Sequence, residues 1–390
     1  MKVCFVSFEY PPRNIGGAGT YADLLVKGLK KRGVDVYTIT RGNSTDHDQK
    51  IYRIPVRDVA YLRRLLFITP VMELLRDLNK IHKFDIVHFN EPHIVTSHPD
   101  SAMVCTFHST QLHELELGLQ GRSLKTAESI RDLVLKNPLG YLWDIYTGRM
   151  SDRIICPCSD LVKLLKYCLV DEQKINVISN GIDPELFNKI NCDTALLDEY
   201  GIEKDNFVLY IGRLYSLKGV HYLIKAFQSI KKENTKLKLV IAGTGDFEPY
   251  LRKIAQGTND TLFIGYVKSL MIKKLLYENC LTVVVPSIYE TFPMVVLEAM
   301  TCGKPVVASN VGGIRSMIRH GKNGFLVKPG DVRGLEIFIK KLYEDPNLRR
   351  KMGIFGRKLV KEEFTVDKMV DETLKVYESV METFSEKYQA

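Results

Sequence analysis

The chain has 390 residues, of which 45% are hydrophobic and 26% are charged, and it carries a formal net charge of +9. This length exceeds one typical hydrophobic core and predicts two domains, while the composition excludes a disordered or fibrous chain. The basic residues are scattered among acidic ones instead of forming a stripe with aromatic residues, so we expect no nucleic acid partner. Because no apolar run is long enough to cross a bilayer and the chain opens on a strand-like segment rather than a signal peptide, we expect a cytoplasmic protein.

The first half of the chain alternates strand-like and helix-like segments. A helix is predicted over Thr20–Arg32, and strands are predicted at Lys2–Phe8, Asp35–Thr40, Asp85–Phe89, Ala102–Phe107, Arg153–Cys156 and Lys174–Ile178. Near-continuous Val, Ile and Leu runs joined by helical connectors indicate a parallel sheet that is covered on both faces.

Glycines follow the first strand, in the segment 15–20 that contains Gly16 and Gly17. The segment fits the relaxed dinucleotide pattern formally, but its glycines begin eight residues beyond Phe8, and Asp35 stands at the beginning of the second strand instead of its end. We therefore expect a long glycine-bearing loop over a cleft, where the backbone can approach a phosphate or a sugar. A second glycine turn, with Gly243 and Gly245, ends a later strand and is a weaker signal of contact with the donor.

Two polar stretches of the first half carry little weight. Asp46-His47-Asp48 has the D-x-D pattern by which another class of sugar transferases holds a divalent ion, but no apolar strand precedes it. Arg57–Arg76 contains an apolar Leu65-Leu66-Phe67 run between arginines. That stretch could contact a membrane surface, although an amphipathic helix packed on its own domain is the favoured interpretation.

His108 directly follows the strand Ala102–Phe107, where a side chain is expected to point into the cleft. His82, His88, His93, His98 and His113 lack ligand spacing, and we expect no metal among them. Cys156-Pro157-Cys158 is the only close cysteine pair, and no second pair completes a zinc site. We interpret these cysteines as reduced and structural.

A dense turn cluster, Asn180 to Pro184, separates the first half from a second series of strands and predicts the hinge. Residues 1–182 are therefore expected to form one domain and residues 183–365 another. The strands of the second series are predicted at Phe207–Ile211, Lys238–Ala242, Thr261–Ile264, Leu281–Val285, Pro305–Ala308 and Gly324–Val327. Only helix is expected afterwards, ending in Val366–Tyr388. Two doubly wound domains that face each other make a cleft, and ligands bind at the carboxyl ends of their strands.

Two cations, Arg213 and Lys218, follow the strand Phe207–Ile211 directly. The planar guanidinium and the compact ammonium can neutralise a diphosphate, and they can stabilise the charge that a leaving nucleoside diphosphate gains in sugar transfer. The alternative is a pair of solvated loop cations, and the position at a strand end favours the functional interpretation.

The strongest signal is the segment Glu290–Met300, which follows another strand end. Pro293 suits the first turn of a helix and Thr291 can cap it, so Glu290 is placed on the loop and Glu298 inside the helix. The free N–H groups at that helix start suit a negative ligand, and a carboxylate accepts hydrogen bonds from the hydroxyls of a ribose or a hexose. The alternative makes Ser287 and Glu290 a capping box and Glu298 a solvated residue.

In combination these segments resemble the retaining GT-B glycosyltransferases of family four, a group related to sucrose synthase and bacterial mannosyltransferases. The resemblance rests on the opening from Phe8 to Gly17, the hinge from Asn180 to Asp183, Gly212-Arg213 with Lys218-Gly219, Gly243-Thr244-Gly245, and the E-x7-E element from Glu290 to Glu298. It covers the whole chain and implies two Rossmann-like domains, with a final helix over about 366–390 that returns to the first domain.

The resemblance also implies roles. Arg213 and Lys218 would bind the donor diphosphate, Glu298 the ribose hydroxyls, and His108 would lie beside the reacting face of the sugar. The remaining donor contacts would be made by Glu290, Thr291, Phe292, Pro293, Met294 and Val295 around the sugar, by Gly16 and Gly17 at the phosphates, and by Tyr266 and Val267 at the base. Position 293 departs from the family pattern, where glycine is frequent, and proline removes one N–H donor there.

The function expected from the sequence is metal-independent transfer of a hexose, with retention, from a UDP-, ADP- or GDP-sugar to a sugar, glycan or lipid acceptor. No cofactor is expected. A sugar-nucleotide epimerase on the same scaffold is the main alternative, and a non-catalytic nucleotide-sugar-binding partner is the second. The pairing of Arg213 and Lys218 with Glu290 and Glu298 argues against the epimerase.

Overall fold

The computed structural model describes residues 1–12, 16–43, 48–56, 63–92, 100–110, 140–188, 190, 197, 199–233, 236–257 and 260–389. The chain divides into two compact units, Met1–Gly181 with Val366–Ala390, and Ile182–Thr365. The sequence boundary after residue 182 differs from this division by one residue. The final helix belongs to the first unit.

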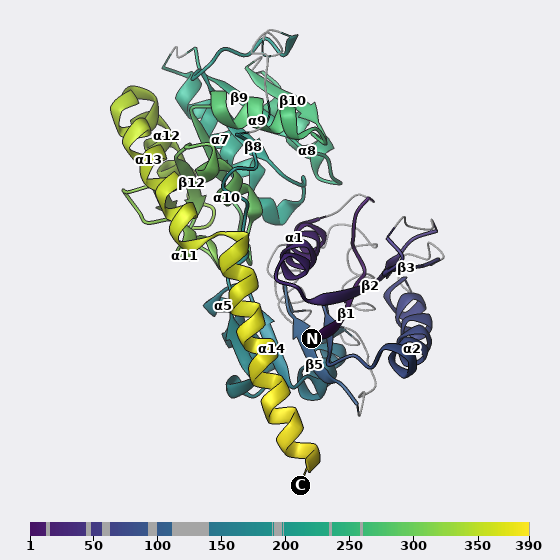
Figure 1. The fold of residues 1–390 in the computed structure, drawn as a ribbon. Helices are drawn as coiled ribbons and strands as arrows, with labels where there is room; N and C mark the ends of the chain where they lie inside the picture. The colour runs from purple at the N-terminus through teal and green to yellow at the C-terminus, as the bar shows by residue number, and fades with distance from the viewer. Residues whose placement is uncertain are drawn as a thin grey trace. The chain divides into compact units, whose positions relative to one another are not determined.

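The first unit is built on one sheet with the strand order β3-β2-β1-β4-β5-β6-β7 (Figure 1). Its strands are β1 (Lys2–Ser7), β2 (Asp35–Arg41), β3 (Ile51–Ile54), β4 (Ile86–Phe89), β5 (Ala102–Thr106), β6 (Arg153–Cys156) and β7 (Ile175–Val177). Its helices are α1 (Gly17–Lys31), α2 (Arg63–His82), a segment over 140–150, α5 (Ser159–Tyr167), the short 3-10 helix η1 (Glu172–Lys174) and α14 (Val366–Gln389). Every strand pair is parallel, as the apolar runs predict.

Apolar packing joins α14 to the rest of the first unit. Val370 and Tyr377 of α14 share one buried cluster with Leu25 and Leu29 of α1 and with residues of β1. Gly28 permits the close approach of the two helices, because a Cβ at this position would lie 2.3 Å from the Cγ2 of Val370. The C-terminal helix is therefore an integral part of this unit.

The second unit has a sheet with the order β10-β9-β8-β11-β12-β13, again with parallel pairs. Its strands are β8 (Phe207–Ile211), β9 (Lys238–Ala242), β10 (Thr261–Gly265), β11 (Thr282–Val285), β12 (Val306–Ser309) and β13 (Gly324–Val327). Its helices are η2 (Ser216–Lys218), α7 (Val220–Lys231), α8 (Glu248–Ala255), α9 (Leu270–Asn279), α10 (Met294–Thr301), α11 (Ile314–Met317), α12 (Val332–Glu344) and α13 (Pro346–Glu363). The central strands β8 and β11 are buried along their whole length, which explains their continuous apolar sequences.

Two expectations about the first unit need correction. The helix predicted from Thr20 begins earlier, because α1 starts at Gly17 with Gly16 as its N-cap residue, so the glycine-bearing connection after β1 ends at Gly16. The strand β3 was not predicted, because Ile51–Ile54 is a four-residue strand at the edge of the sheet and follows a polar segment.

Candidate functional site

The loop after β8 is held against the end of β11 by a glycine. Gly219 follows η2 with a φ of +67°, and a Cβ at this position would lie 1.9 Å from the carbonyl oxygen of Pro286. Only glycine combines this left-handed backbone with so close an approach. The packing places Lys218, the last residue of η2, beside the segment that follows β11.

Lys218 and Glu290 form an ion pair there. The Nζ of Lys218 lies 2.5 Å from Oε1 of Glu290, and the Ser287 hydroxyl donates to the same oxygen at 3.0 Å. The side chains of Lys218 and Glu290 are only 24% and 11% exposed, so the interpretation of Lys218 as a solvated cation is wrong. Ser287 and Glu290 do not form a capping box either, because no helix begins between them and the next helix starts at Met294.

Arg213 belongs to the same loop as Lys218, between β8 and α7. The Tyr210 hydroxyl donates to the Arg213 carbonyl at 2.8 Å, and the exposed guanidinium lies 5.1 Å from the centroid of the Tyr215 ring. Burial raises the pKa of Tyr210; the charge of Glu290 acts in the same direction and that of Arg213 opposes it. The structure pairs Lys218 with Glu290 and places Arg213 earlier on the same loop as Lys218.

Glu298 is buried and hydrogen-bonded, so it is not a solvated helix residue. Its side chain is 11% exposed; Oε2 accepts a hydrogen bond from the Tyr277 hydroxyl at 2.7 Å, and Oε1 lies 3.3 Å from the Nζ of Lys273. Burial raises the pKa of Tyr277 further above its usual range, which keeps its hydroxyl protonated as a donor. The sequence interpretation missed Tyr277 and Lys273, since only the packing of α9 on α10 brings them to Glu298.

The start of α10 differs from the sequence prediction. Pro293 is the N-cap residue rather than a residue of the first turn, because its ψ of 111° is extended, and no side chain caps the helix, so Thr291 does not have the expected capping role. The backbone before the helix is held instead by Gly312 and Gly313. A Cβ at Gly312, whose φ is +48°, would lie 1.7 Å from the carbonyl oxygen of Glu290, and Gly313 N–H donates to the Thr291 carbonyl.

The packing of neighbouring backbone explains why positions 243 and 245 are glycine, which the sequence did not reveal. A Cβ at Gly243 would lie 1.8 Å from the Gly212 carbonyl oxygen, and one at Gly245 would lie 2.4 Å from the Leu214 carbonyl oxygen. Their turn therefore supports the backbone on either side of Arg213. Contact of these glycines with a donor stays a prediction.

The segment after β10 presents Tyr266, whose side chain is 58% exposed, followed by the buried Val267. Ser269 then caps α9 by accepting the N–H of Ile272. An exposed aromatic ring is suited to stack on a planar base. Contact of this ring with the base of the donor stays a prediction.

In the first unit, Gly16 and Gly17 differ in their surroundings. Gly16 N–H donates to Oε2 of Glu9 at 2.9 Å, and a Cβ at Gly16 would lie 3.2 Å from the same oxygen. A Cβ at Gly17 would meet nothing within 4 Å among the described residues. The fold as described does not require glycine at position 17, which suits a place where a ligand approaches the backbone.

His108 is half-buried and has one defined tautomer. Asn90 donates from Nδ2 to the Ala18 carbonyl at 3.1 Å and to the Ser7 hydroxyl at 3.0 Å, so its Oδ1, which lies 3.1 Å from Nε2 of His108, must be the acceptor. Nε2 therefore carries the proton. Burial lowers the pKa of His108 to about 4, so the ring is neutral at physiological pH and its Nδ1 is an acceptor. Asn90 was not singled out from the sequence.

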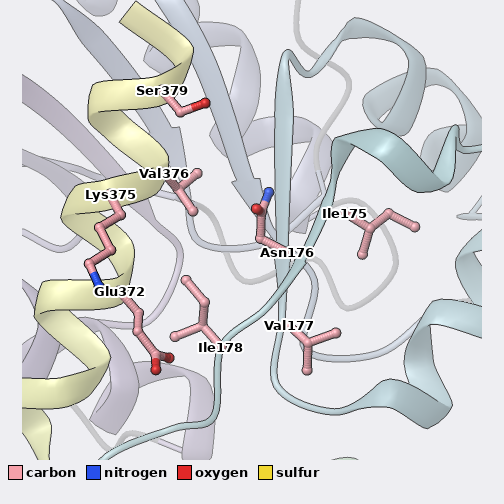
Figure 2. A pocket seen from close by; sticks show the side chains of 8 residues that line it. All are labelled: Ile175, Asn176, Val177, Ile178, Glu372, Lys375, Val376 and Ser379. Atoms are coloured by element: carbon pink, nitrogen blue, oxygen red, sulfur yellow. The ribbon is translucent and has the colours of Figure 1, made fainter.

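A separate pocket of the first unit lies between β7 and α14 (Figure 2). Glu372, Lys375, Val376 and Ser379 line it from the helix, and Ile175 to Ile178 line it from the strand side. None of the predicted site residues contributes to this pocket, and it has no part in the site described above.

The structure describes only part of the D-x-D segment 46–48, where a metal was considered, and only part of the stretch 57–76, where membrane contact was considered. Asp46 and His47 lie outside the described residues, while Asp48 pairs with Lys30 at 2.7 Å. Among the described residues, no group of three or more His, Cys, Asp or Glu side chains could hold a metal ion, and no helix could span a membrane.

Of the arginines in the stretch 57–76, Arg57 also lies outside the described residues, as do the side chains of Arg63 and Arg64. Cys156 and Cys158 are buried, and neither is part of a disulfide.

Comparison with known proteins matches both halves of the chain. The family model described as glycosyl transferases group 1 matches residues 194–359, and the model of glycosyltransferase family 4 matches residues 15–186. An uncharacterized glycosyltransferase of Methanocaldococcus jannaschii is 31% identical over 98% of this chain and 99% of its own length. A sucrose-phosphate synthase from Thermosynechococcus elongatus has a similar structure, with a TM-score of 0.79 at 19% identity over 98% of this chain and 99% of that chain. HepE of Anabaena, in complex with UDP-glucose, has a TM-score of 0.70 at 19% identity over 99% of this chain and 100% of that chain.

Proposed function

The chain belongs to glycosyltransferase family 4, and on this premise we propose that it transfers a hexose from a nucleoside-diphosphate sugar to an acceptor, with retention and without a metal ion. Its fold is GT-B, with two Rossmann-like parallel-sheet units, as the sequence predicted. The similar structure of HepE contains UDP-glucose, which supports a nucleotide sugar as the donor of this chain. The observation that carries the proposal is the ion pair of Lys218 and Glu290, with Arg213 on the same loop as Lys218.

In the proposed reaction the two cations bind the donor diphosphate. The bond between C1 of the sugar and the diphosphate oxygen breaks, and negative charge accumulates on that oxygen. Lys218 and Arg213 stabilise this charge, and because they are positioned before the reaction they need little reorganisation. The acceptor oxygen bonds to C1 on the same face, which retains the configuration, and the departing diphosphate takes the acceptor proton.

Glu290 is given a holding role rather than the role of a base. Its Oε1 already accepts from Lys218 and from Ser287, so this carboxylate is charge-balanced and hydrogen-bonded before any substrate binds. Glu290 thereby fixes Lys218 and leaves Oε2 to accept from a sugar hydroxyl. A mechanism in which the diphosphate removes the acceptor proton requires no separate protein base.

The other predicted residues surround the same donor in this proposal. Thr291 to Val295 offer backbone groups to the sugar at the start of α10, and Tyr266 and Val267 meet the base. Glu298 binds the ribose. From the first unit, Gly16 and Gly17 contact the phosphates, and the Nδ1 of His108 accepts from a sugar hydroxyl.

We propose a sugar, glycan or lipid acceptor. Contact of the stretch 57–76 with a membrane surface stays a prediction. The buried, reduced cysteines suit a protein of the cytoplasm, where thiols stay reduced.

The proposal is tested by incubating the purified protein with UDP-, GDP- and ADP-sugars and measuring nucleoside diphosphate release, first alone and then with acceptors. Slow release without an acceptor and faster release with one are expected. Conversion of the sugar without release would favour the epimerase alternative, which the family membership does not support. An inert protein across the donor panel would contradict the proposal.

A further inference from the structure

The carboxylate of Glu298 is held by two side chains of one helix. Tyr277 and Lys273 are four residues apart on α9, so they lie on the same side of that helix. Tyr277 donates to Oε2 at 2.7 Å and Lys273 lies 3.3 Å from Oε1, so each oxygen has its own partner. The two contacts fix both the position and the rotation of the carboxylate plane.

Tyr277 has little freedom to turn away from Glu298. Its side chain is fully buried, and its ring packs edge-on against Phe187 with centroids 5.9 Å apart. A buried carboxylate without a hydrogen-bond donor is costly, so the hydroxyl and the acid stabilise each other. Tyr277 therefore acts as a rigid anchor of Oε2.

Lys273 is placed differently. Its side chain is 25% exposed, so its ammonium group lies at the edge of the buried cluster, within reach of solvent and ligands. One of its three N–H groups points to Oε1, which leaves two donors, and Oε1 can accept another hydrogen bond. Together Oε1 and Nζ offer one acceptor and one donor side by side.

We propose that Lys273 and Glu298 recognise the vicinal hydroxyls of the donor ribose as a pair, and that Tyr277 positions Glu298 for this contact. One hydroxyl donates to Oε1 of Glu298, and its neighbour accepts from Lys273. The helix α9 follows directly on Tyr266 and Val267, the residues assigned to the base, which suits a ribose at this place. The inference rests on the proposed function and adds a specificity: ribonucleotides are favoured over deoxyribonucleotides.

The test compares the Kd values of UDP, GDP and ADP with those of their 2′-deoxy forms, measured by calorimetry. Loss of a hydroxyl removes a hydrogen bond to a charged group, so the wild-type protein should bind the ribose form about 10- to 100-fold more tightly. Because the two side chains act as a pair, Lys273→Met and Tyr277→Phe should each lower the ratio of the two Kd values towards one. A merely structural defect would instead weaken both nucleotides in parallel and leave the ratio unchanged.

Matched controls come from the same unit. Lys274→Met changes the neighbouring lysine, whose Nζ contacts the Ile190 carbonyl, and Tyr343→Phe changes a tyrosine of α12. Both controls should keep the wild-type ratio. If Tyr277→Phe fails to fold, Lys273→Met carries the test alone.

The outcomes distinguish a failure of the ribose contact from a failure of the proposed function. A nucleoside diphosphate that binds without discriminating its deoxy form, or a ratio that both variants preserve, overturns this inference alone. If none of the three nucleoside diphosphates binds the wild-type protein, the proposed function itself fails.

Discussion

The Nζ of Lys218 lies 2.5 Å from Oε1 of Glu290, although the two residues are 72 positions apart in the chain. They follow β8 and β11, which are neighbours in the sheet, so the topology brings the two strand ends together. Ser287 donates to the same oxygen, and Gly219 lets the two loops touch. The cation assigned to the diphosphate is thus fixed before any donor arrives.

Removal of this cation should reduce catalysis strongly. In Lys218→Ala the leaving diphosphate loses a positioned charge, and kcat/KM should fall by the equivalent of about 2–4 kcal/mol. Steady-state measurement of nucleoside diphosphate release checks this value. Lys225→Ala, which removes an exposed lysine of α7, should be nearly silent, and wild-type activity of Lys218→Ala would refute the diphosphate role.

Chelation should not abolish activity. The proposed charge stabilisation comes from Arg213 and Lys218, so no divalent ion is required. Donor turnover measured with and without EDTA should agree. Complete loss that added metal restores would revive the D-x-D interpretation of Asp46-His47-Asp48.

His108 should be a neutral ring with its proton on Nε2. Asn90 accepts from this N–H, and burial lowers the pKa of His108 to about 4. Nitrogen NMR of labelled protein, with His108→Gln for assignment, should show the Nε2–H form at neutral pH.

In Asn90→Asp a carboxylate faces the same N–H, so the pKa of His108 should rise and the acid limb of the kcat/KM profile should move to higher pH. A proton on Nδ1 in the wild-type protein would contradict this geometry.

Burial of His88 should make the first unit sensitive to acid. Its pKa is lowered from 6.5 to about 3 by burial, and its ring nitrogens contact Tyr377 and Thr106. Between pH 6.5 and pH 3 the histidine is protonated in the unfolded chain and neutral in the folded one, so the unfolded chain binds more protons. The free energy of unfolding is therefore unaffected by His88 above pH 6.5 and decreases as the pH falls towards 3. The loss reaches at most about 1.4 kcal/mol for each pH unit.

Urea unfolding across this pH range measures the effect. The dependence of the free energy of unfolding on pH should be less steep in His88→Gln than in the wild type. His82→Gln, which changes a half-buried histidine of the same unit, serves as the control. Equal slopes for the wild type and His88→Gln would show that His88 does not titrate as described.

The strand pattern could be predicted well, because buried parallel strands need continuous apolar runs. The strands Arg153–Cys156, Phe207–Ile211 and Lys238–Ala242 have the bounds that the sequence indicates. The strand Ile51–Ile54 escaped prediction because an edge strand is only half-buried and carries no such run. The start of α1 at Gly17 was missed because glycine is a weak helix former, and only the tertiary contacts of the helix outweigh that preference.

Residues that follow strand ends could also be predicted, since the sheet topology alone gathers them. Their partners could not. Tyr277 and Lys273 meet Glu298 through the packing of two helices, and Asn90 meets His108 across neighbouring strands, so nothing in the local sequence marks these contacts. The glycines at 243 and 245 were predicted to contact the donor, and the structure adds a packing requirement for them that the sequence does not show.

The central claim is that the diphosphate of the donor binds to Lys218 and Arg213. A crystal structure of the protein with a bound nucleoside diphosphate tests it most directly. The account predicts phosphate oxygens within hydrogen-bonding distance of Lys218 Nζ and the Arg213 guanidinium, with the ribose at Glu298. A nucleotide bound elsewhere, with Lys218 still paired only to Glu290, would contradict it.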